Sequence, residues 1–173
     1  MSVEPSILYK LMILYMLNHV SFPLTNTQLS SFFLEKGYTT YFNFQSAIKD
    51  LLDENLVSEE TVRHTSYYTI TSSGVEAIEG FSKKIPVTIA DELDTYVTEN
   101  KYEYRNEVGT MADYYKSSIA GDYIVHCQIK EGSSSLIELN LSVPTDEEAE
   151  TICENWRGAS QSIYDFCIKV LLK

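Results

Sequence analysis

Hydrophobic positions in the first half of the chain recur at helical spacing and then at strand-like spacing. The run Ile7–Leu17 is apolar except for Lys10. This predicts a helix covered on most sides, serving as a central core helix, a dimer-interface helix or both. A second helix follows the capping-box pair Thr25 and Gln28. The pattern then predicts a third helix from near Asn43, strands at about 56–62 and 67–71, and a fourth helix opened by Ser73 and Glu76.

The second half of the chain has a different order of elements. Pro86 ends one pattern and Thr88 can cap the next helix, so we expect a boundary between residues 84 and 85. Alternation then predicts three strands, the last with Ile137, Leu139, Leu141 and Val143 facing inward. The expected elements are a helix ending near residues 100–104, strands at about 108–116, 123–129 and 136–143, and a long helix capped by Thr145.

Helix, strand, short polar tip, strand and helix is the order of a winged helix. The sequence therefore predicts an α+β protein, with an N-terminal winged helix-turn-helix over residues 1–84. An αβββα domain with a three-stranded antiparallel sheet follows over residues 85–173, serving dimerisation or regulation. In a winged helix, the third helix enters the major groove and the wing contacts the flanking backbone. The DNA-binding residues expected on this basis are Tyr38, Thr39, Thr40, Tyr41, Asn43, Gln45, Ser46, Lys49, Arg63 and His64.

Charge weighs against nucleic acid as a partner. The chain carries 13 Lys+Arg against 25 Asp+Glu, a net charge of -12. DNA-binding proteins normally present a basic surface. Residues 1–84 hold six Lys+Arg and nine Asp+Glu, so three quarters of the net negative charge lies outside the predicted DNA-binding domain. Double-stranded DNA remains the expected partner, and the alternative is a protein-interaction module with a degenerate winged helix.

Residues of catalytic type are present but their spacing does not assemble a site. His126 and Cys127 are neighbours on a predicted strand and would face opposite sides. Cys153 and Cys167 lie on an apolar helical stripe, where inert buried thiols are the expectation. We therefore expect no enzyme activity, no metal and no cofactor. The many tyrosines leave a small-molecule sensor with a Tyr-lined cavity as a further alternative.

Localisation follows from the cysteines and from the apolar run. Three cysteines without CxxC spacing indicate a reducing compartment, so we expect a cytoplasmic protein. The run Ile7–Leu17 is too short to cross a bilayer, and Glu4 stands where a signal peptide has positive charge, so no membrane association is expected.

Four stretches from both halves of the chain carry a family likeness: FPLTNTQLSSFFLEKGYTTYFNFQSAIKDLL, YYTITSSGVEAIEGF, ADYY and VPTDEEAETICENW. On these residues the N-terminal half resembles PadR- and MarR-like winged-helix transcriptional regulators. The whole chain is similar to a bacterial winged-helix family of unknown function with a DNA-binding assignment. The resemblance implies an intracellular, homodimeric regulator of transcription. The first and last helices are the expected interface, and a two-fold dimer would place two recognition helices about 34 Å apart.

Overall fold

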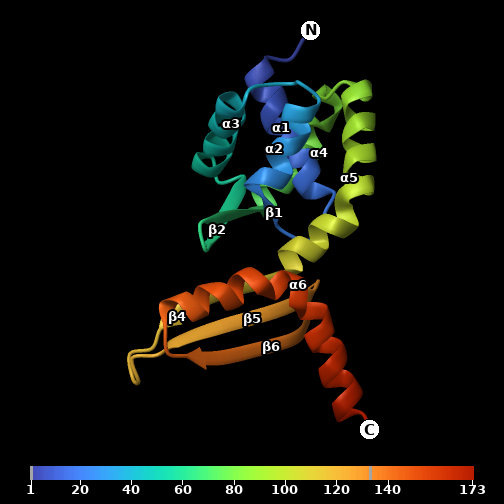
Figure 1. The fold of residues 1–173 in the computed structure, drawn as a ribbon. Helices are drawn as coiled ribbons and strands as arrows, with labels where there is room; N and C mark the ends of the chain where they lie inside the picture. Colours follow the sequence, from blue (N-terminus) through green and yellow to red (C-terminus); the bar gives the residue numbers. More distant parts are fainter. Residues whose placement is uncertain (1, 133) are drawn as a thin grey trace. The chain divides into compact units, whose positions relative to one another are not determined.

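The chain folds into two compact units, residues 1–104 and 105–173 (Figure 1). The structure is a computed structural model and describes residues 2–132 and 134–173. Over these residues it is α+β, with six α-helices and two three-stranded antiparallel sheets. The units are described separately.

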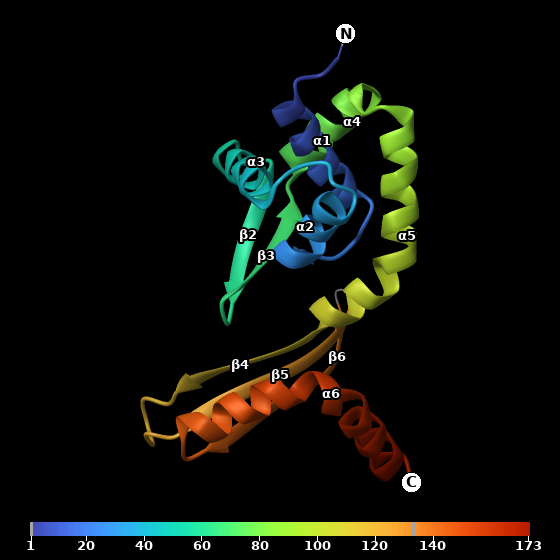
Figure 2. The same cartoon turned by 45° about the horizontal axis from the view of Figure 1, so that its top comes forward.

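The N-terminal apolar run forms the centre of the first unit. Helix α1 (Pro5–Asn18) buries residues on all of its sides, which confirms the prediction of a covered helix. It contacts both α3 and α4 within this unit, so its apolar surface is used in the core. In Figures 1 and 2, α1 and α2 lie between α3 on one side and the first part of α5 on the other. The remaining helices of the unit are α2 (Asn26–Glu35), α3 (Tyr41–Asp53), α4 (Ser72–Phe81), a 3-10 turn η1 (Ser82–Lys84) and the first part of α5 (Val87–Gly109).

A small sheet follows α3. Strands β2 (Val57–Val62) and β3 (Thr65–Ile70) form a hairpin, and the short β1 (Leu24–Thr25) pairs with the other edge of β3. The hairpin turn consists of Arg63 and His64, whose φ angles are 47° and 67°. Both residues therefore adopt the left-handed conformation that a two-residue hairpin turn requires.

The long helix α5 explains where the units divide. Its residues Leu93, Tyr96 and Val97 are buried in the core of the first unit. The compact units therefore divide between Tyr104 and Arg105, while the expected domain boundary at 84/85 stays a prediction. Polar contacts also join α1 and α5.

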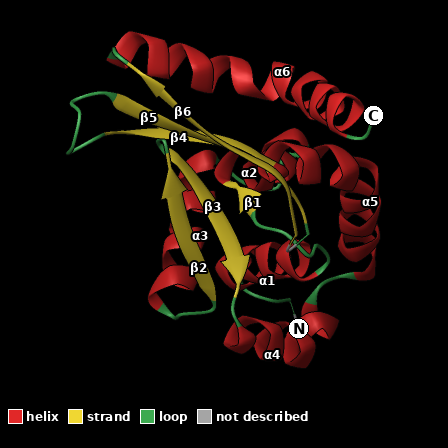
Figure 3. Cartoon of the chain, turned by 90° about the horizontal axis from the view of Figure 1, so that it is seen from below, coloured by secondary structure: helices red, strands yellow, loops and turns green. Residues whose placement is uncertain are grey.

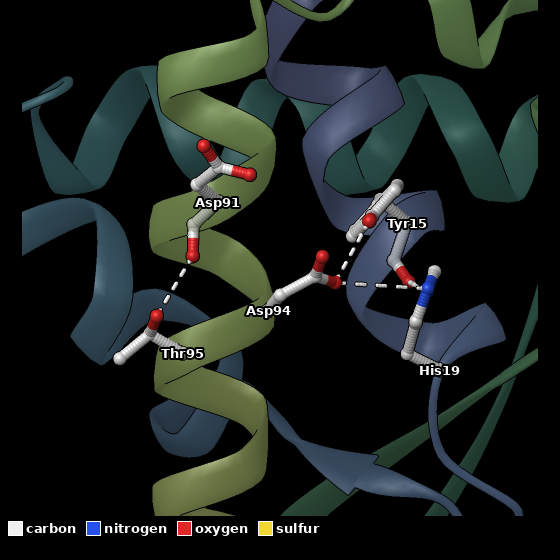
Figure 4. Close-up of polar contacts among 5 residues, drawn as sticks. All are labelled: Tyr15, His19, Asp91, Asp94 and Thr95. Carbon is white, nitrogen blue, oxygen red and sulfur yellow. Dashed lines mark hydrogen bonds and ion pairs between the residues drawn. The ribbon is translucent and has the colours of Figure 1, made fainter.

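Figure 4 shows Asp94 of α5 directed at the end of α1. The Tyr15 hydroxyl donates to Asp94 Oδ1 at 2.8 Å, and His19 Nε2 lies 3.8 Å from the same oxygen. The rings of Tyr15 and His19 stack with centroids 4.0 Å apart. Partial burial and the hydrogen bond to Asp94 raise the pKa of Tyr15 to about 12. These contacts hold the first part of α5 against the first unit.

The second unit is a three-stranded sheet covered on one face by a helix. Its strands are β4 (Thr110–Lys116), β5 (Tyr123–Glu131) and β6 (Ser134–Val143), in the order β4-β5-β6, which agrees with the expected antiparallel sheet. Helix α6 (Asp146–Leu171) packs against the sheet, and Figure 3 shows its first part running alongside the strands. The core contains Val125, Cys127 and Trp156, and Trp156 Nε1 donates to the Gln128 carbonyl at 3.1 Å. Leu141, expected to face inward, is 41% exposed because β6 is an edge strand.

Candidate functional site

Helix α3 presents one side to the core and the opposite side to solvent. Phe44, Ala47, Ile48 and Leu51 are buried at helical spacing. At 100° per residue, Phe42 falls on the opposite side from Phe44, and its side chain is 80% exposed. Ser46 and Lys49 are also exposed on this helix. We call the exposed set Phe42, Ser46 and Lys49 the outer face of α3.

The residues just before α3 fix the position of the helix. The Tyr38 hydroxyl donates to Glu92 Oε2 at 2.7 Å, and the Tyr38 carbonyl accepts from the Tyr9 hydroxyl at 3.1 Å. The Tyr38 ring stacks on Phe32 with centroids 5.6 Å apart. Partial burial raises the pKa of Tyr38 to about 12, with a smaller contribution from the hydrogen bond to Glu92. Tyr38 therefore links α1, α2 and α5 through its own contacts.

The two threonines that precede α3 differ in their contacts. The Thr39 hydroxyl oxygen is buried and has no hydrogen-bond partner within the described part of the chain. The Thr40 hydroxyl accepts the Asn43 backbone N–H at 3.3 Å and caps α3. Such a cap stabilises a helix by about 1 kcal/mol. Of the sequence-predicted set, Thr40 and Tyr38 thus hold α3 in place rather than extend its outer face.

Asn26 connects the start of α2 to the first two turns of α3. Its Oδ1 accepts hydrogen bonds from the Tyr41 hydroxyl at 3.2 Å and from Gln45 Nε2 at 2.8 Å. Its Nδ2 donates to the Tyr68 hydroxyl of β3 at 3.4 Å. Tyr41 and Gln45, both predicted to contact DNA, are thus held toward α2. Asn26 fixes the orientation of α3 relative to the hairpin strand β3.

Two further predicted residues lie toward α1. Asn43 and Ser46 line an open groove of about 350 Å³ together with Glu4, Tyr9 and Asp50. Ser46 therefore stands at the edge between this groove and the outer face of α3. Lys49 and Ser46 thus lie on one side of α3. Asn43 lies toward the N-terminal end of α1.

The hairpin supplies one cation at its tip and two carboxylates along its first strand. Arg63 is partly exposed and His64 is exposed. Glu59 and Glu60 are exposed on β2, and the Tyr68 hydroxyl donates to Glu59 Oε1 at 3.4 Å. Arg63 and Lys49 are the only Lys or Arg between residues 37 and 82 of the sequence. Exposed carboxylates of α3, its C-terminal end and β2 outnumber these two cations: Asp50, Asp53, Glu54, Glu59 and Glu60. The electrostatic surface around α3 and the hairpin is therefore acidic.

Two residues of this site were not predicted from the sequence. Phe42 could have been found by placing α3 on a helical wheel, since it falls opposite the buried positions. Asn26 carries no such signal, because its importance depends on the tertiary approach of α2 to α3.

Other kinds of site receive no support from the described residues. Within residues 2–132 and 134–173, no group of three or more His, Cys, Asp or Glu side chains could hold a metal ion. None of the helices in the same residues is long and apolar enough to cross a bilayer. Tyr96 lines a hollow of about 220 Å³, but the other residues there include Asp91, Glu92 and Glu99, so this hollow is acidic rather than aromatic.

The fold and the site define an α+β protein. Its first unit carries a three-stranded sheet and, beside it, the helix α3 with one face exposed to solvent. A family model described as "Domain of unknown function (DUF4364)" matches residues 9–171, and the chain belongs to this family. No curated protein matches the chain. No solved structure matches it either.

Proposed function

We propose that the first unit is a winged helix that binds double-stranded DNA, and that the chain acts as a homodimeric transcriptional regulator. In this proposal α3 enters the major groove and the Arg63–His64 turn contacts the flanking backbone. The observation that carries it is the outer face of α3, which is exposed while the opposite face is anchored in the core. The element order, the sheet order β1-β3-β2 and the likeness to PadR- and MarR-like regulators support the same proposal.

The chemistry of the outer face suits a major groove. Lys49 can contact a phosphate or a guanine edge, and the Ser46 hydroxyl can donate to either phosphate or base. Phe42 can make apolar contact with the C5-methyl group of thymine. Because Thr40 caps α3 and Asn26 holds its first turns, these side chains start from a fixed helix. Little of the binding free energy is then lost in ordering the reading surface.

The charge distribution sets a clear expectation for salt dependence. Each phosphate neutralised contributes about -0.9 to the slope of log K against log salt concentration. With Lys49 and Arg63 as the cations near the site, we expect about two such contacts per chain and a slope near -4 for a dimer. Binding that depended mainly on backbone charge would give a much steeper slope.

The test is selection from a pool of random duplexes, followed by fluorescence anisotropy of the enriched sequence across a salt series. Lys49→Glu should weaken binding at least tenfold and reduce the slope by about one per chain. Lys116→Glu makes the same charge change at an exposed position of β4 and is the matched control. Enrichment of no sequence by the folded protein, or equal losses in both variants, would refute the proposal.

A protein-interaction module is the second candidate, and a specific observation favours it. Phe42 and Tyr41 are 80% and 53% exposed, and Glu59 and Glu60 are exposed on the hairpin. Exposed aromatic residues are typical anchors of protein interfaces, while glutamates repel DNA phosphates. If DNA selection fails, Phe42→Ala should abolish capture of a protein partner that the wild-type chain retains.

A further inference from the structure

The apolar stripe that attaches α6 to its sheet continues beyond the residues that the sheet covers. Four positions at successive spacings of four, three and four are buried against the sheet: Ala149, Cys153, Trp156 and Ser160. The same helical face continues through Ile163, Phe166, Cys167, Val170 and Leu171. We call these last five positions the terminal stripe.

Element lengths account for the uncovered end. Helix α6 has 26 residues, which at 1.5 Å per residue gives about 39 Å. Strands β5 and β6 have 9 and 10 residues, or about 30 Å each. In Figures 1 and 2 the C-terminal part of α6 bends and extends past the strands of its own unit. The last turns of the helix thus have no sheet beneath them.

The terminal stripe begins at Ile163, which still packs against the core of the second unit, and becomes strongly exposed toward the end of α6. Phe166 is 66% exposed, Val170 45% and Leu171 78%, while Ile168 and Leu172 are 42% and 79% exposed. Phe166, Val170 and Leu171 belong to the stripe and expose together roughly 350 Å² of mainly apolar surface, against about 800 Å² per partner in a standard protein interface. A contiguous apolar patch of a few hundred Å² is of the size that marks an interaction site.

The charge of the terminal segment of α6 suits a second copy of this chain as the partner. Residues 146–158 carry five carboxylates and one arginine, whereas residues 159–173 carry Asp165, Lys169 and Lys173. The terminal segment is therefore slightly positive on a chain of net charge -12. It is the part of the long helix where two copies of an acidic chain can approach with little repulsion.

We propose that the terminal stripe of α6 binds the same stripe of a second copy of this chain, in a two-fold antiparallel pair. An antiparallel pair centred near Cys167 places Ile163 of one chain beside the partner's Leu171, because residues equally far from Cys167 meet. Asp165 and Lys169 lie on the opposite side of the helix, about 160° from Cys167, so the contact itself is uncharged. The contact is then self-complementary in its apolar side chains, as a two-fold interface requires. This deepens the proposed function by naming the surface of its homodimer, and it rests on that function only for the expectation of two copies.

The burial of α1 bears on the expectation that the first helix forms part of the interface. The sequence left α1 as a core helix, an interface helix or both, but residues 11–14, 16 and 17 are buried within the first unit. Its largest exposed apolar side chain is Ile7, at 41%. Helix α1 therefore leaves little apolar surface for a partner, whereas the end of α6 exposes several apolar side chains.

The decisive experiment measures oligomeric state without DNA, so its outcome is independent of the proposed DNA binding. Sedimentation velocity of the full chain over a micromolar range should give a dimer. Phe166→Glu and Leu171→Glu should each raise the dimer dissociation constant about 30-fold or more. Ile119→Glu is the matched control, since Ile119 is 96% exposed in the loop between β4 and β5. It should leave the dimer unchanged.

A second measurement needs no destabilising substitution. A short bis-maleimide should cross-link two copies through Cys167, and Cys167→Ser should prevent it. The other two thiols are buried, and burial raises the pKa of Cys127 to about 11, so neither competes. A monomeric wild type, a dimer that persists in both glutamate variants, or a failure to cross-link at Cys167 would overturn the proposal. Circular dichroism of each variant distinguishes loss of pairing from loss of fold.

Discussion

Two glycines of α4 should respond in opposite directions to the same substitution. Gly74 is buried, and an added Cβ would overlap the Leu56 carbonyl oxygen and lie 2.7 Å from Ile70 Cγ1. Gly80 lies near the end of the same helix, with nothing within 4 Å of the Cβ that alanine would add. We therefore expect Gly74→Ala to destabilise the first unit and Gly80→Ala to stabilise it.

The magnitudes follow from the close approach at Gly74. Overpacking a tight site costs about 1–3 kcal/mol, and the Leu56 carbonyl belongs to backbone that cannot swing away, so the cost lies near 3 kcal/mol. Alanine recovers about 1 kcal/mol of helix propensity at either position. The net expectation is a loss of about 2 kcal/mol for Gly74→Ala and a gain of about 0.5–1 kcal/mol for Gly80→Ala.

The assay is urea unfolding followed by far-UV circular dichroism. For a slope of about 2 kcal/mol/M, the midpoint should fall by about 1 M in Gly74→Ala and rise by about 0.4 M in Gly80→Ala. The single tryptophan, Trp156, lies in the second unit, so its fluorescence reports separately on that unit. Equal midpoints for the two variants would refute the close contact between α4 and the residues leading into β2.

Two further changes test the hairpin turn and the contacts that fix α3. His64→Gly should raise the free energy of unfolding by about 0.4–1 kcal/mol, because His64 is exposed and glycine adopts its φ of 67° without strain; a lower urea midpoint would contradict this. Tyr38 has a pKa raised to about 12 by partial burial and by Glu92, so it keeps its proton in the folded state while the unfolded state ionises from about pH 10. The contribution of Tyr38 to the free energy of unfolding should therefore be lost as the pH rises through this window. The loss of stability between pH 10 and 12 should be smaller in Tyr38→Phe than in the wild type. It should be unchanged in Tyr115→Phe, a control in the second unit.

Local patterns in the sequence predicted the elements well. The capping box is confirmed, since Gln28 N donates to Thr25 Oγ1 at 3.1 Å and Thr25 N donates to Gln28 Oε1 at 2.9 Å. Thr145 likewise accepts from Glu148 N at 3.2 Å and opens α6. These signals lie within four residues of one another and depend little on the rest of the fold.

Features set by long-range contacts were not predictable in the same way. Ser73 was expected to cap α4, but Thr71 does so, and its hydroxyl also donates to the Asn55 carbonyl at 2.8 Å. Strand β1 has two residues, too few to show alternation, and exists because it pairs with β3. The helical spacing of apolar residues in α5 is visible in the sequence. It does not tell whether Leu93 and Tyr96 enter the core of the first unit or that of the second.

The candidate site shows the same division. Chain position alone selected the residues around the start of the third helix, so the predicted set included Tyr38, which bonds to α5, and Gln45, which bonds to α2. The direction of each side chain around the helix axis separates these residues from Phe42. That direction follows from the buried positions, which the sequence had already identified.

The charge of the site decides what its binding free energy can consist of. Near α3 and the hairpin, Lys49 and Arg63 are outnumbered by exposed carboxylates, namely Asp50, Asp53, Glu54, Glu59 and Glu60. Non-specific binding to DNA is almost wholly electrostatic, so it should be very weak for this chain. If the chain binds DNA, the affinity must therefore come from base contacts along the outer face of α3 and from two chains acting together. A dimer makes both sets of contacts at once, and the second becomes effectively intramolecular. Weak backbone binding and pairing through α6 are thus linked: breaking the pair with Phe166→Glu should abolish specific DNA binding by a folded chain, although Phe166 lies in the unit that does not contain α3.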